Sequence, residues 1–421
     1  MKAISVLQIG DVHYPCNKDV RLVDRKDTSV PAIASAISPK ALPKVIRAIS
    51  TLAQKRPPAA ILVCGDLTTR GNTDAYERCV KYLITSLKLV ASKNKNDIHV
   101  VPGNHDVDRE LCTLRAELNL NKFDRLAAAW RTEYDDVLVT NGVRETHVSD
   151  SRRELTIFSL NSCIGCGEWR LLPDHVRDEL GAAIEDLRKR DPTAAFRVEG
   201  EQLDTPMFDH DDIETLNQKI RDLDINVIPV VLAHHNLLPQ ELQRIELYTE
   251  LINSGQFRTT LTAADRPVVY CHGHIHKSPI ESICDSTKRE SQLISVSAPQ
   301  LTDGFNELRF HFSRQQQPLG VDVVLHRIMD NGNVVELDCH RIPFANRQSF
   351  LTQELEDLKS CLTSDRIRFA ILKQSFEKQC GVETNQLSFE ELIVEAEWLG
   401  MVEIENNDKP ALYWLIRRKW V

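Results

Sequence analysis

Short clusters of metal-binding side chains directly follow apolar, β-rich runs at five places in the chain. The runs end in Asp11-Val-His13, Gly65-Asp66, Gly103-Asn104-His105-Asp106, His234-His235 and His272-Gly-His274-Ile-His276. In open α/β sheets the loops past the carboxyl ends of the strands open onto one crevice. Each cluster alone is a weak signal, because a lone His is more often a core or surface residue than a ligand. Together the clusters predict a layered α/β fold in which five loops meet at one site.

The side chains in these clusters suit two hard or borderline metal ions. Carboxylate, imidazole and amide oxygen bind Mn²⁺, Fe, Zn²⁺ or Mg²⁺, and no cysteine stands at a ligand position to enforce a soft structural site. Two such ions about 3.5 to 4 Å apart can clamp a phosphoryl group and lower the pKa of a bridging water, which gives a hydroxide nucleophile at neutral pH. The clusters therefore predict a metal-dependent phosphoester hydrolase.

The order of the motifs, D-x-H, G-D, G-N-H-D, a His after an apolar strand and G-H-x-H, resembles the calcineurin-like metallophosphoesterases over residues 1 to about 300. The resemblance implies a β-sandwich flanked by helices and a pair of divalent ions, with Mn²⁺ or Fe preferred over Zn²⁺ or Mg²⁺. It also implies that Asp66 bridges both ions. The other ligands would be Asp11, His13 and His276 at one ion and Asn104, His234 and His274 at the other.

The resemblance further implies that His105 lies off the metals and protonates or stabilises the leaving oxygen, while Asp106 orients it. This agrees with the chemistry, because a leaving alkoxide needs a proton donor that coordination does not consume. We prefer His234 to His235 as a ligand because members of the family carry the ligand as the first residue after the strand.

The segment from Ile61 to Gly71, followed by Asp74 and Tyr76, is similar to the cyclic-nucleotide phosphodiesterase branch of the family, as are Leu160-Asn-Ser162 and the His-His pair. This similarity implies a phosphodiesterase acting on a nucleotide-type substrate. A nuclease that cuts DNA or RNA together with a partner protein is the alternative. The formal net charge of -9 gives no footprint for non-specific nucleic-acid binding, although a local basic groove would be compatible with it. A non-catalytic scaffold is a third reading, and the intact ligand set with His105 argues against it.

The length of 421 residues accommodates one large core and a smaller appended domain. We expect a phosphoesterase domain over residues 1–345, with insertions at about 14–42 and 107–226. Either the insertions form a lid that selects substrate, with Arg70, Arg109 or His175 on its phosphate, or they are peripheral packing. Arg109, four residues past His105, is the preferred substrate contact, with Arg70 as a second.

Residues 350–421 carry three helical patterns and a terminal hairpin, which predict a small winged-helix-like α+β domain. The third pattern contains Glu390, Glu391, Glu395 and Glu397 without Lys or Arg, which favours a protein-contact module over DNA reading. The basic tail Arg417-Arg-Lys419 favours the opposite.

The sequence contains no stretch of about 20 apolar residues and no signal-peptide pattern at Met1–Gly10, so we expect a cytoplasmic protein without a membrane segment. The eleven cysteines are irregularly spaced, which indicates reduced thiols. Cys163-Ile-Gly-Cys166 is the only C-x-x-C. Because no second Cys or His pair follows at a matching spacing, we interpret it as core thiols rather than a redox or zinc site.

Overall fold

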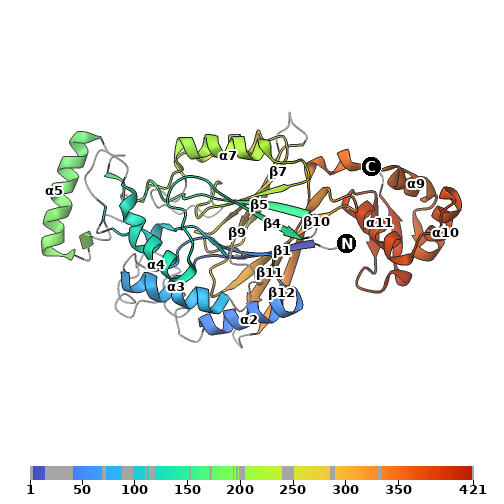
Figure 1. Cartoon of the computed structure of the whole chain (residues 1–421), viewed down its shortest axis with the longest axis horizontal. Helices are drawn as coiled ribbons and strands as arrows, with labels where there is room; N and C mark the ends of the chain where they lie inside the picture. Colours follow the sequence, from blue (N-terminus) through green and yellow to red (C-terminus); the bar gives the residue numbers. More distant parts are fainter. Residues whose placement is uncertain are drawn as a thin grey trace.

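The computed structural model of the chain (Figure 1) describes residues 3–14, 41–68, 73–87, 98–109, 111–112, 119–150, 153–169, 173–192, 194–195, 198, 204–238, 251–284, 290–329 and 333–419. Most of the predicted insertion at 14–42 lies outside these ranges, and so does Arg70.

Two six-stranded sheets form the centre of the fold. The first has the order β12-β11-β10-β1-β2-β3. Its strands are β1 (Ala3–Ile9), β2 (Ala60–Val63), β3 (Ile98–Val100), β10 (Gly304–Phe312), β11 (Pro318–Ile328) and β12 (Val334–Pro343). Strands β1, β2 and β3 are parallel, whereas β10, β11 and β12 form an antiparallel meander. Strands β11 and β12 form a hairpin within this meander.

The second sheet has the order β4-β5-β6-β7-β9-β8. Its strands are β4 (Arg144–Asp150), β5 (Arg153–Ser159), β6 (Ile228–Leu232), β7 (Pro267–His272), β8 (Ile280–Cys284) and β9 (Gln292–Ser297). Strands β5, β6, β7 and β9 are parallel, while β4 and β8 run antiparallel at the two edges. The central parallel strands β6 and β7 are buried on both faces and consist mostly of apolar residues, as expected for strands covered on both sides.

The two sheets pack face to face around one apolar core, to which Val6, Leu62, Ile157, Val230 and Phe310 contribute. Helices cover both outer faces, as Figure 1 shows. Against the first sheet lie α2 (Ala41–Lys55), α3 (Thr73–Leu87) and α4 (Asp124–Tyr134), and against the second lie α7 (His210–Asp222) and α8 (Ser254–Thr262). The predicted sandwich flanked by helices is confirmed.

The predicted insertion at 107–226 contributes strands β4 and β5 to the second sheet, together with helices α4 and α7 of the covering layers. Helix α5 (Asp174–Arg190) differs from them, because it stands apart from the sheets at the left of Figure 1. A small cluster of Trp169, Ile184 and Ala195 holds it there. The described part of this region therefore combines core elements with one projecting helix.

The C-terminal domain has its own core and a three-stranded sheet of order β13-β15-β14. Its elements are α9 (Gln353–Cys361), β13 (Arg366–Arg368), α10 (Phe369–Cys380), α11 (Gln386–Trp398), β14 (Val402–Glu405) and β15 (Leu415–Arg418). Three helices with a small antiparallel sheet confirm the predicted winged-helix-like α+β domain. The described chain also contains short 3-10 helices at η1 (Asn104–Asp106), η2 (Leu120–Phe123), η4 (Ala345–Phe350) and η5 (Ala411–Tyr413).

The C-terminal domain packs against the meander of the first sheet through Trp398. The Arg341 guanidinium lies 4.5 Å from the centre of the Trp398 ring, and the His311 ring lies 4.6 Å from it. His311 pairs with Ala3 at the start of β1, whereas the predicted ligand Asp11 follows the end of that strand. The domain therefore contacts the end of the sandwich opposite the ligand-bearing loops, and Figure 1 shows it beside the chain's N-terminus.

None of the described helices is both long enough and apolar enough to cross a lipid bilayer.

Candidate metal centre

The five predicted clusters converge at the carboxyl ends of β1, β2, β3, β6 and β7. Asp11, His13, Asp66 and His276 form one group, in which one ligand atom from each residue lies within 4.8 Å of the others. His13 Nε2 lies 3.2 Å from His276 Nε2, and His276 Nε2 lies 3.7 Å from Asp11 Oδ1. Burial lowers the pKa of His13 to about 3, although the charge of Asp66 opposes this shift. The low pKa keeps the His13 imidazole in the neutral form that binds metals.

A second group forms around His234. The backbone carbonyl of Cys64 lies 2.6 Å from His234 Nδ1, and because a carbonyl only accepts, Nδ1 carries the proton. The unprotonated Nε2 then faces two oxygens, Asn104 Oδ1 at 3.0 Å and Asp66 Oδ2 at 3.4 Å. The Asn104 amide nitrogen donates to Asp204 Oδ2 at 2.6 Å, which turns its oxygen toward His234. The His274 ring lies 5.1 Å from the His234 ring.

The residues present therefore fit a pair of divalent cations. With the His234 ring in its neutral form, three electron-rich atoms converge in the second group with no proton between them, an arrangement that is unfavourable unless a cation lies among them. Asp66 belongs to both groups, since its Oδ2 is 3.8 Å from His13 Nε2 and 3.4 Å from His234 Nε2. The contact of His234 with the Cys64 carbonyl is the outer-shell bond that commonly fixes a histidine ligand.

Backbone strain is concentrated at the same residues. Asp11, His13, Asp66, His274 and His276 all have positive φ, between 40° and 70°, a region that non-glycine residues rarely adopt. Such strain costs about 1 to 3 kcal/mol for each residue and persists only where the surroundings impose it. The sharp turns bring side chains and backbone N–H groups into the site. His274 N, for example, donates to Asp11 Oδ1 at 3.0 Å.

Gly103 is required by the close approach of two ligand loops. A methyl group on its Cα would overlap the carboxylate and the backbone nitrogen of Asp66. The glycine therefore lets the Asn104 loop reach the Asp66 loop without a Cβ between them.

His105 is exposed, whereas its neighbours Asn104 and Asp106 are buried. Its ring lies 5.1 Å from the His13 ring, and its backbone N–H donates to Asp66 Oδ1 at 3.0 Å. Partial shielding of the ring from water lowers its pKa, but the negative charges of Asp66, Asp204 and Asp106 outweigh this effect and raise it. The ring is thus placed beside the metal-binding residues, on the solvent side.

Asp106 does not hydrogen-bond to the His105 ring in the described structure, so the predicted orienting contact is not found. Both of its carboxylate oxygens instead accept from neighbouring loops. Oδ1 accepts from Thr68 N at 2.9 Å and from Thr68 Oγ1 at 3.1 Å, and Oδ2 accepts from Leu67 N at 3.0 Å and Gly103 N at 2.9 Å. Burial and the charge of Asp66 raise the Asp106 pKa to about 6. Asp106 therefore ties the Asp66 loop to the Asn104 loop.

Arg109 pairs with Asp204 at 3.0 Å, and its side chain is only 10% exposed. Asp204 in turn holds Asn104, so Arg109 supports a predicted ligand through one intermediate residue. The contact of Arg109 with substrate stays a prediction. Such a contact would require the Arg109 guanidinium to face both Asp204 and a phosphate group. His175 is exposed on the projecting helix α5.

Sequence reasoning missed Asp204 and the role of His235. The Asp204 carboxylate contacts both Asn104 and Arg109, although about a hundred residues separate it from them in the sequence. One ring nitrogen of His235 lies within 4.8 Å of ring nitrogens of His234 and His274, and His235 Nδ1 lies 2.9 Å from Ser162 Oγ. Ser162 Oγ also accepts from the backbone N–H groups of His234 and His235, both at 3.2 Å. No local pattern marks these contacts, because the fold alone brings the partners together.

Solved structures with a similar fold include a dimetal phosphatase from Danio rerio, with 14% identity, 82% of this chain and 100% of that chain covered, and a TM-score of 0.46. GAP50, the anchor in the inner membrane complex of Plasmodium, has 8% identity, coverages of 82% and 90%, and a TM-score of 0.44. A putative 5'-nucleotidase from Staphylococcus aureus has 15% identity and a TM-score of 0.36, with 89% of this chain but only 58% of that chain covered. No curated protein matches the chain.

The model of the family described as calcineurin-like phosphoesterase matches residues 4–278. This range holds every predicted metal ligand, from Asp11 to His276, and both sheets contribute strands to it. The chain belongs to the calcineurin-like phosphoesterase family and is a metal-dependent phosphoester hydrolase.

Proposed function

We propose that this chain is a phosphodiesterase that hydrolyses a small nucleotide-type phosphoester, using two divalent ions, with Mn²⁺ or Fe as the expected pair. The observation that carries the proposal is the convergence of lone pairs around Asp66. Asp11, His13 and His276 would hold one ion, Asn104, His234 and His274 the other, and Asp66 both. Bound there, the two ions would neutralise phosphoryl charge and supply a nucleophilic water of lowered pKa.

His105 would act as the proton donor to the leaving oxygen. Its exposed ring lies beside His13 without belonging to either group of converging ligand atoms, so coordination would not consume its proton. Asp106 would support this role indirectly, by holding the loop that carries His105. Asp204 would aim the Asn104 oxygen, with Arg109 securing Asp204 from the other side.

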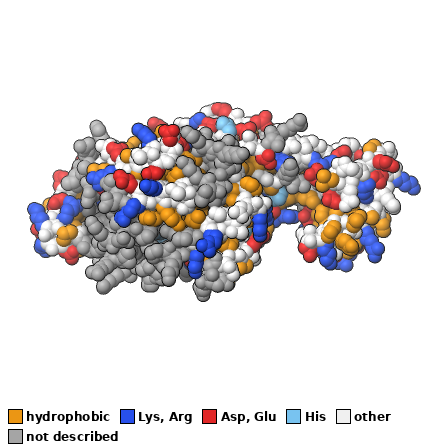
Figure 2. Space-filling view, turned by 60° about the horizontal axis from the view of Figure 1, so that its bottom comes forward, with side chains coloured by type: hydrophobic (Ala, Val, Ile, Leu, Met, Phe, Trp, Pro, Cys, Tyr) orange, Lys and Arg blue, Asp and Glu red, His pale blue; other side chains and the backbone are white. Residues whose placement is uncertain are grey.

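Surface charge favours a small substrate over a long nucleic acid. On the described part of the face shown in Figure 2, Lys and Arg are interspersed with Asp and Glu rather than gathered into a basic stripe. In the C-terminal domain, Arg417 and Lys419 both lie near Glu403, at 3.6 and 3.9 Å, so the basic tail is partly neutralised. Nucleic-acid binding normally requires several uncompensated cations along the phosphate backbone.

The C-terminal domain is proposed to bind a protein partner. Figure 2 shows hydrophobic side chains gathered on one face of this domain. Its large hydrophobic side chains that are at least 45% exposed are Leu351, Ile371, Val382, Leu387, Leu412 and Tyr413. Exposed apolar groups are typical of protein interfaces rather than of DNA-reading surfaces. The predicted cytoplasmic location is kept as part of this proposal.

The test is hydrolysis by the purified full-length protein, with Mn²⁺ or with a chelator. The substrates are bis-p-nitrophenyl phosphate, p-nitrophenyl phosphate, cyclic nucleotides, and single- and double-stranded DNA. Metal-dependent cleavage of the diester and of cyclic nucleotides is expected. Cleavage of the monoester alone would replace the proposal with a phosphatase, and cleavage of DNA would favour the nuclease. No cleavage of any substrate with both ions bound would refute the proposal.

Three histidine and aspartate variants test the assigned roles. His105→Ala should retain two metal equivalents but lose most turnover, whereas Asp66→Ala should lose both metal and turnover. The exposed His340 on β12 provides the control, since His340→Ala should change neither. Equal metal content in the His105 and Asp66 variants would contradict the assignment.

A further inference from the structure

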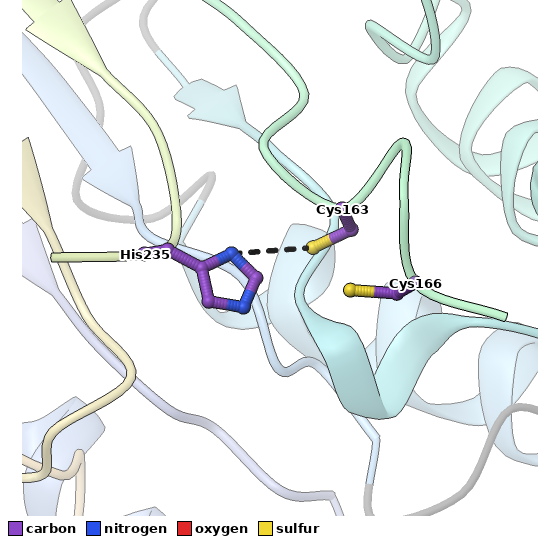
Figure 3. Close-up of side chains that lie close together, drawn as sticks. All are labelled: Cys163, Cys166 and His235. Carbon is purple, nitrogen blue, oxygen red and sulfur yellow. Dashed lines mark hydrogen bonds between the residues drawn. The ribbon is translucent and has the colours of Figure 1, made fainter. Parts of the chain in front are cut away.

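A second cluster of metal-binding side chains lies beside the dinuclear centre, in the turn that follows β5. Cys163 and Cys166 are fully buried, and the Cys166 N–H donates to the Cys163 carbonyl at 3.0 Å. Their two sulfur atoms and one ring nitrogen of His235 all lie within 4.8 Å of one another. Figure 3 shows both sulfur atoms pointing toward the His235 ring, and Cys163 Sγ lies 3.9 Å from His235 Nδ1.

These separations are close to those of a tetrahedral zinc site. With Zn–S near 2.3 Å and Zn–N near 2.0 to 2.1 Å, neighbouring ligand atoms are about 3.3 to 3.8 Å apart. Cys163 Sγ and His235 Nδ1, 3.9 Å apart, need to contract by only a few tenths of an ångström to reach this range, and the other two separations are below 4.8 Å. Ser162 Oγ lies 2.9 Å from the same His235 nitrogen and accepts the backbone N–H groups of His234 and His235, so its lone pairs are engaged and the three side chains are the ligands that the cluster offers.

The fold holds both halves of the cluster in place. Lys122, which is fully buried, donates to the carbonyls of Ile164 at 2.6 Å and Cys166 at 2.7 Å, and to Glu168 at 2.6 Å. On the other side, the Tyr270 hydroxyl donates to the His235 carbonyl at 2.6 Å. The ligand atoms are thus brought together by surrounding bonds, which is the preorganisation that metal sites require.

We propose that Cys163, Cys166 and His235 form a third metal site, which binds one Zn²⁺. Its two sulfur ligands select a softer ion than the oxygen- and nitrogen-rich dinuclear centre, which suits Mn²⁺ or Fe. Binding would release the two thiol protons, and the two thiolates would balance the charge of the ion, so the buried site would be neutral.

The site would position the dinuclear centre rather than take part in the reaction. His235 follows the predicted ligand His234, and its ring lies 4.5 Å from the ring of the predicted ligand His274. An ion that fixes His235 to the β5 turn would therefore restrict the movement of two ligands of the second group.

A reactive thiol pair is the competing explanation, and the surroundings of the sulfurs disfavour it. Burial raises the pKa of Cys166 well above its usual value and also raises the pKa of Cys163, so the reactive thiolate is scarce without a metal. Both side chains are also closed off from solvent. A disulfide would need an oxidant to reach them.

The experiment uses cobalt as a spectroscopic substitute for zinc in the full-length protein. Thiolate ligands give Co²⁺ an intense near-ultraviolet charge-transfer band, and no proposed ligand of the dinuclear centre contains sulfur. We expect the band in the wild type, its loss in Cys163→Ser and in Cys166→Ser, and its retention in Cys361→Ser, which changes a buried thiol of the C-terminal domain. Asp66→Ala should keep the band while losing the ions of the dinuclear centre, which separates this proposal from the proposed function.

Metal content gives the second measurement. The zinc-loaded wild type should hold three equivalents and Cys163→Ser two, and X-ray absorption of the zinc in the folded wild type should show sulfur neighbours near 2.3 Å even if the serine variants fail to fold. Absence of the band in the cobalt-loaded wild type, or its persistence in both serine variants, would overturn the proposal. A Cys163–Cys166 disulfide in freshly purified protein would do the same.

Discussion

Replacing Asp106 by Asn tests how the ligand loops are held together. The carboxylate accepts four hydrogen bonds, two on each oxygen, from Leu67, Thr68 and Gly103. An amide keeps only one acceptor oxygen and presents an NH₂ group to the other pair of donors. With the amide oxygen at the Oδ1 position, the N–H groups of Leu67 and Gly103 would both lack an acceptor.

The expected loss of stability follows from these two donors. A buried N–H without a partner costs about 1 to 3 kcal/mol, so Asp106→Asn should destabilise the protein by about 2 to 6 kcal/mol. The measurement is urea unfolding at pH 8, because the Asp106 pKa is about 6 and the wild-type carboxylate must be charged for the comparison. Leu67 follows Asp66 and Gly103 precedes Asn104, so metal content should fall as well.

Asp209→Asn is the matched control for Asp106→Asn. Asp209 caps helix α7 by accepting one N–H, from Asp211 at 2.9 Å, and Asn is an equally good capping residue. Its effect should stay within about 0.5 kcal/mol. If the two variants were equally stable, the argument that Asp106 ties two ligand loops together would be refuted.

Further predictions concern other parts of the chain. Gly103→Ala should lose at least one metal equivalent by mass spectrometry, because its methyl group would overlap Asp66, whereas Gly255→Ala, with open space around its Cα, should lose none. Burial alone would raise the pKa of Glu307, but His326, Arg309 and Arg56 lower it from 4.5 to about 2. Because this folded-state pKa is depressed, Glu307 should stabilise the fold above about pH 4.5 by about 3 kcal/mol, and this contribution should disappear as the pH falls toward 2. Urea unfolding between these pH values should show a shallower decline in Glu307→Gln, and an unchanged slope would contradict the ion-pair argument. Arg314→Ala should lower the stability of the C-terminal domain by about 3 kcal/mol in calorimetry, because it removes the 2.9 Å partner of the fully buried Glu395; a shift under about 1 kcal/mol would count against it. Chelation should lower the melting temperature, since the ions would offset the strain of the five ligand residues with positive φ, and an unaltered melting temperature would mean that the protein alone sustains that strain.

The sequence predicts the metal ligands better than it predicts the residues that hold those ligands in place. Asp11 and His276 could be recognised because each follows an apolar strand within a short motif, and motifs of this kind depend only on local order. Asp204 could not, because its contacts with Asn104 and Arg109 join segments about a hundred residues apart. His235 likewise lies 72 residues from Cys163 in the sequence. The C-x-x-C spacing therefore does not reveal His235 as the third side chain of that cluster.

The edge strands were missed for a different reason. Strand β4, Arg144–Asp150, has mostly polar residues with only Val148 buried, and its sequence lacks the apolar run that marks a central strand. Strand β8 is exposed in the same way. As a result, a segment that completes the second sheet was interpreted as part of an insertion. A strand with almost no buried residues lacks the alternation of apolar and polar residues that marks a half-buried strand.

The C-terminal domain, where we propose that a protein partner binds, lies at the end of the molecule opposite the metal centre. Asp11 lies eight residue steps along the chain from Ala3, which is beside His311, and this corresponds to about 26 Å at about 3.3 Å for each step. A protein bound to the far side of that domain would leave the entrance to the metal centre open, and both ends of the molecule could be occupied at once. Such a partner would determine where in the cell the substrate is hydrolysed, while the rate of hydrolysis would remain a property of the opposite end.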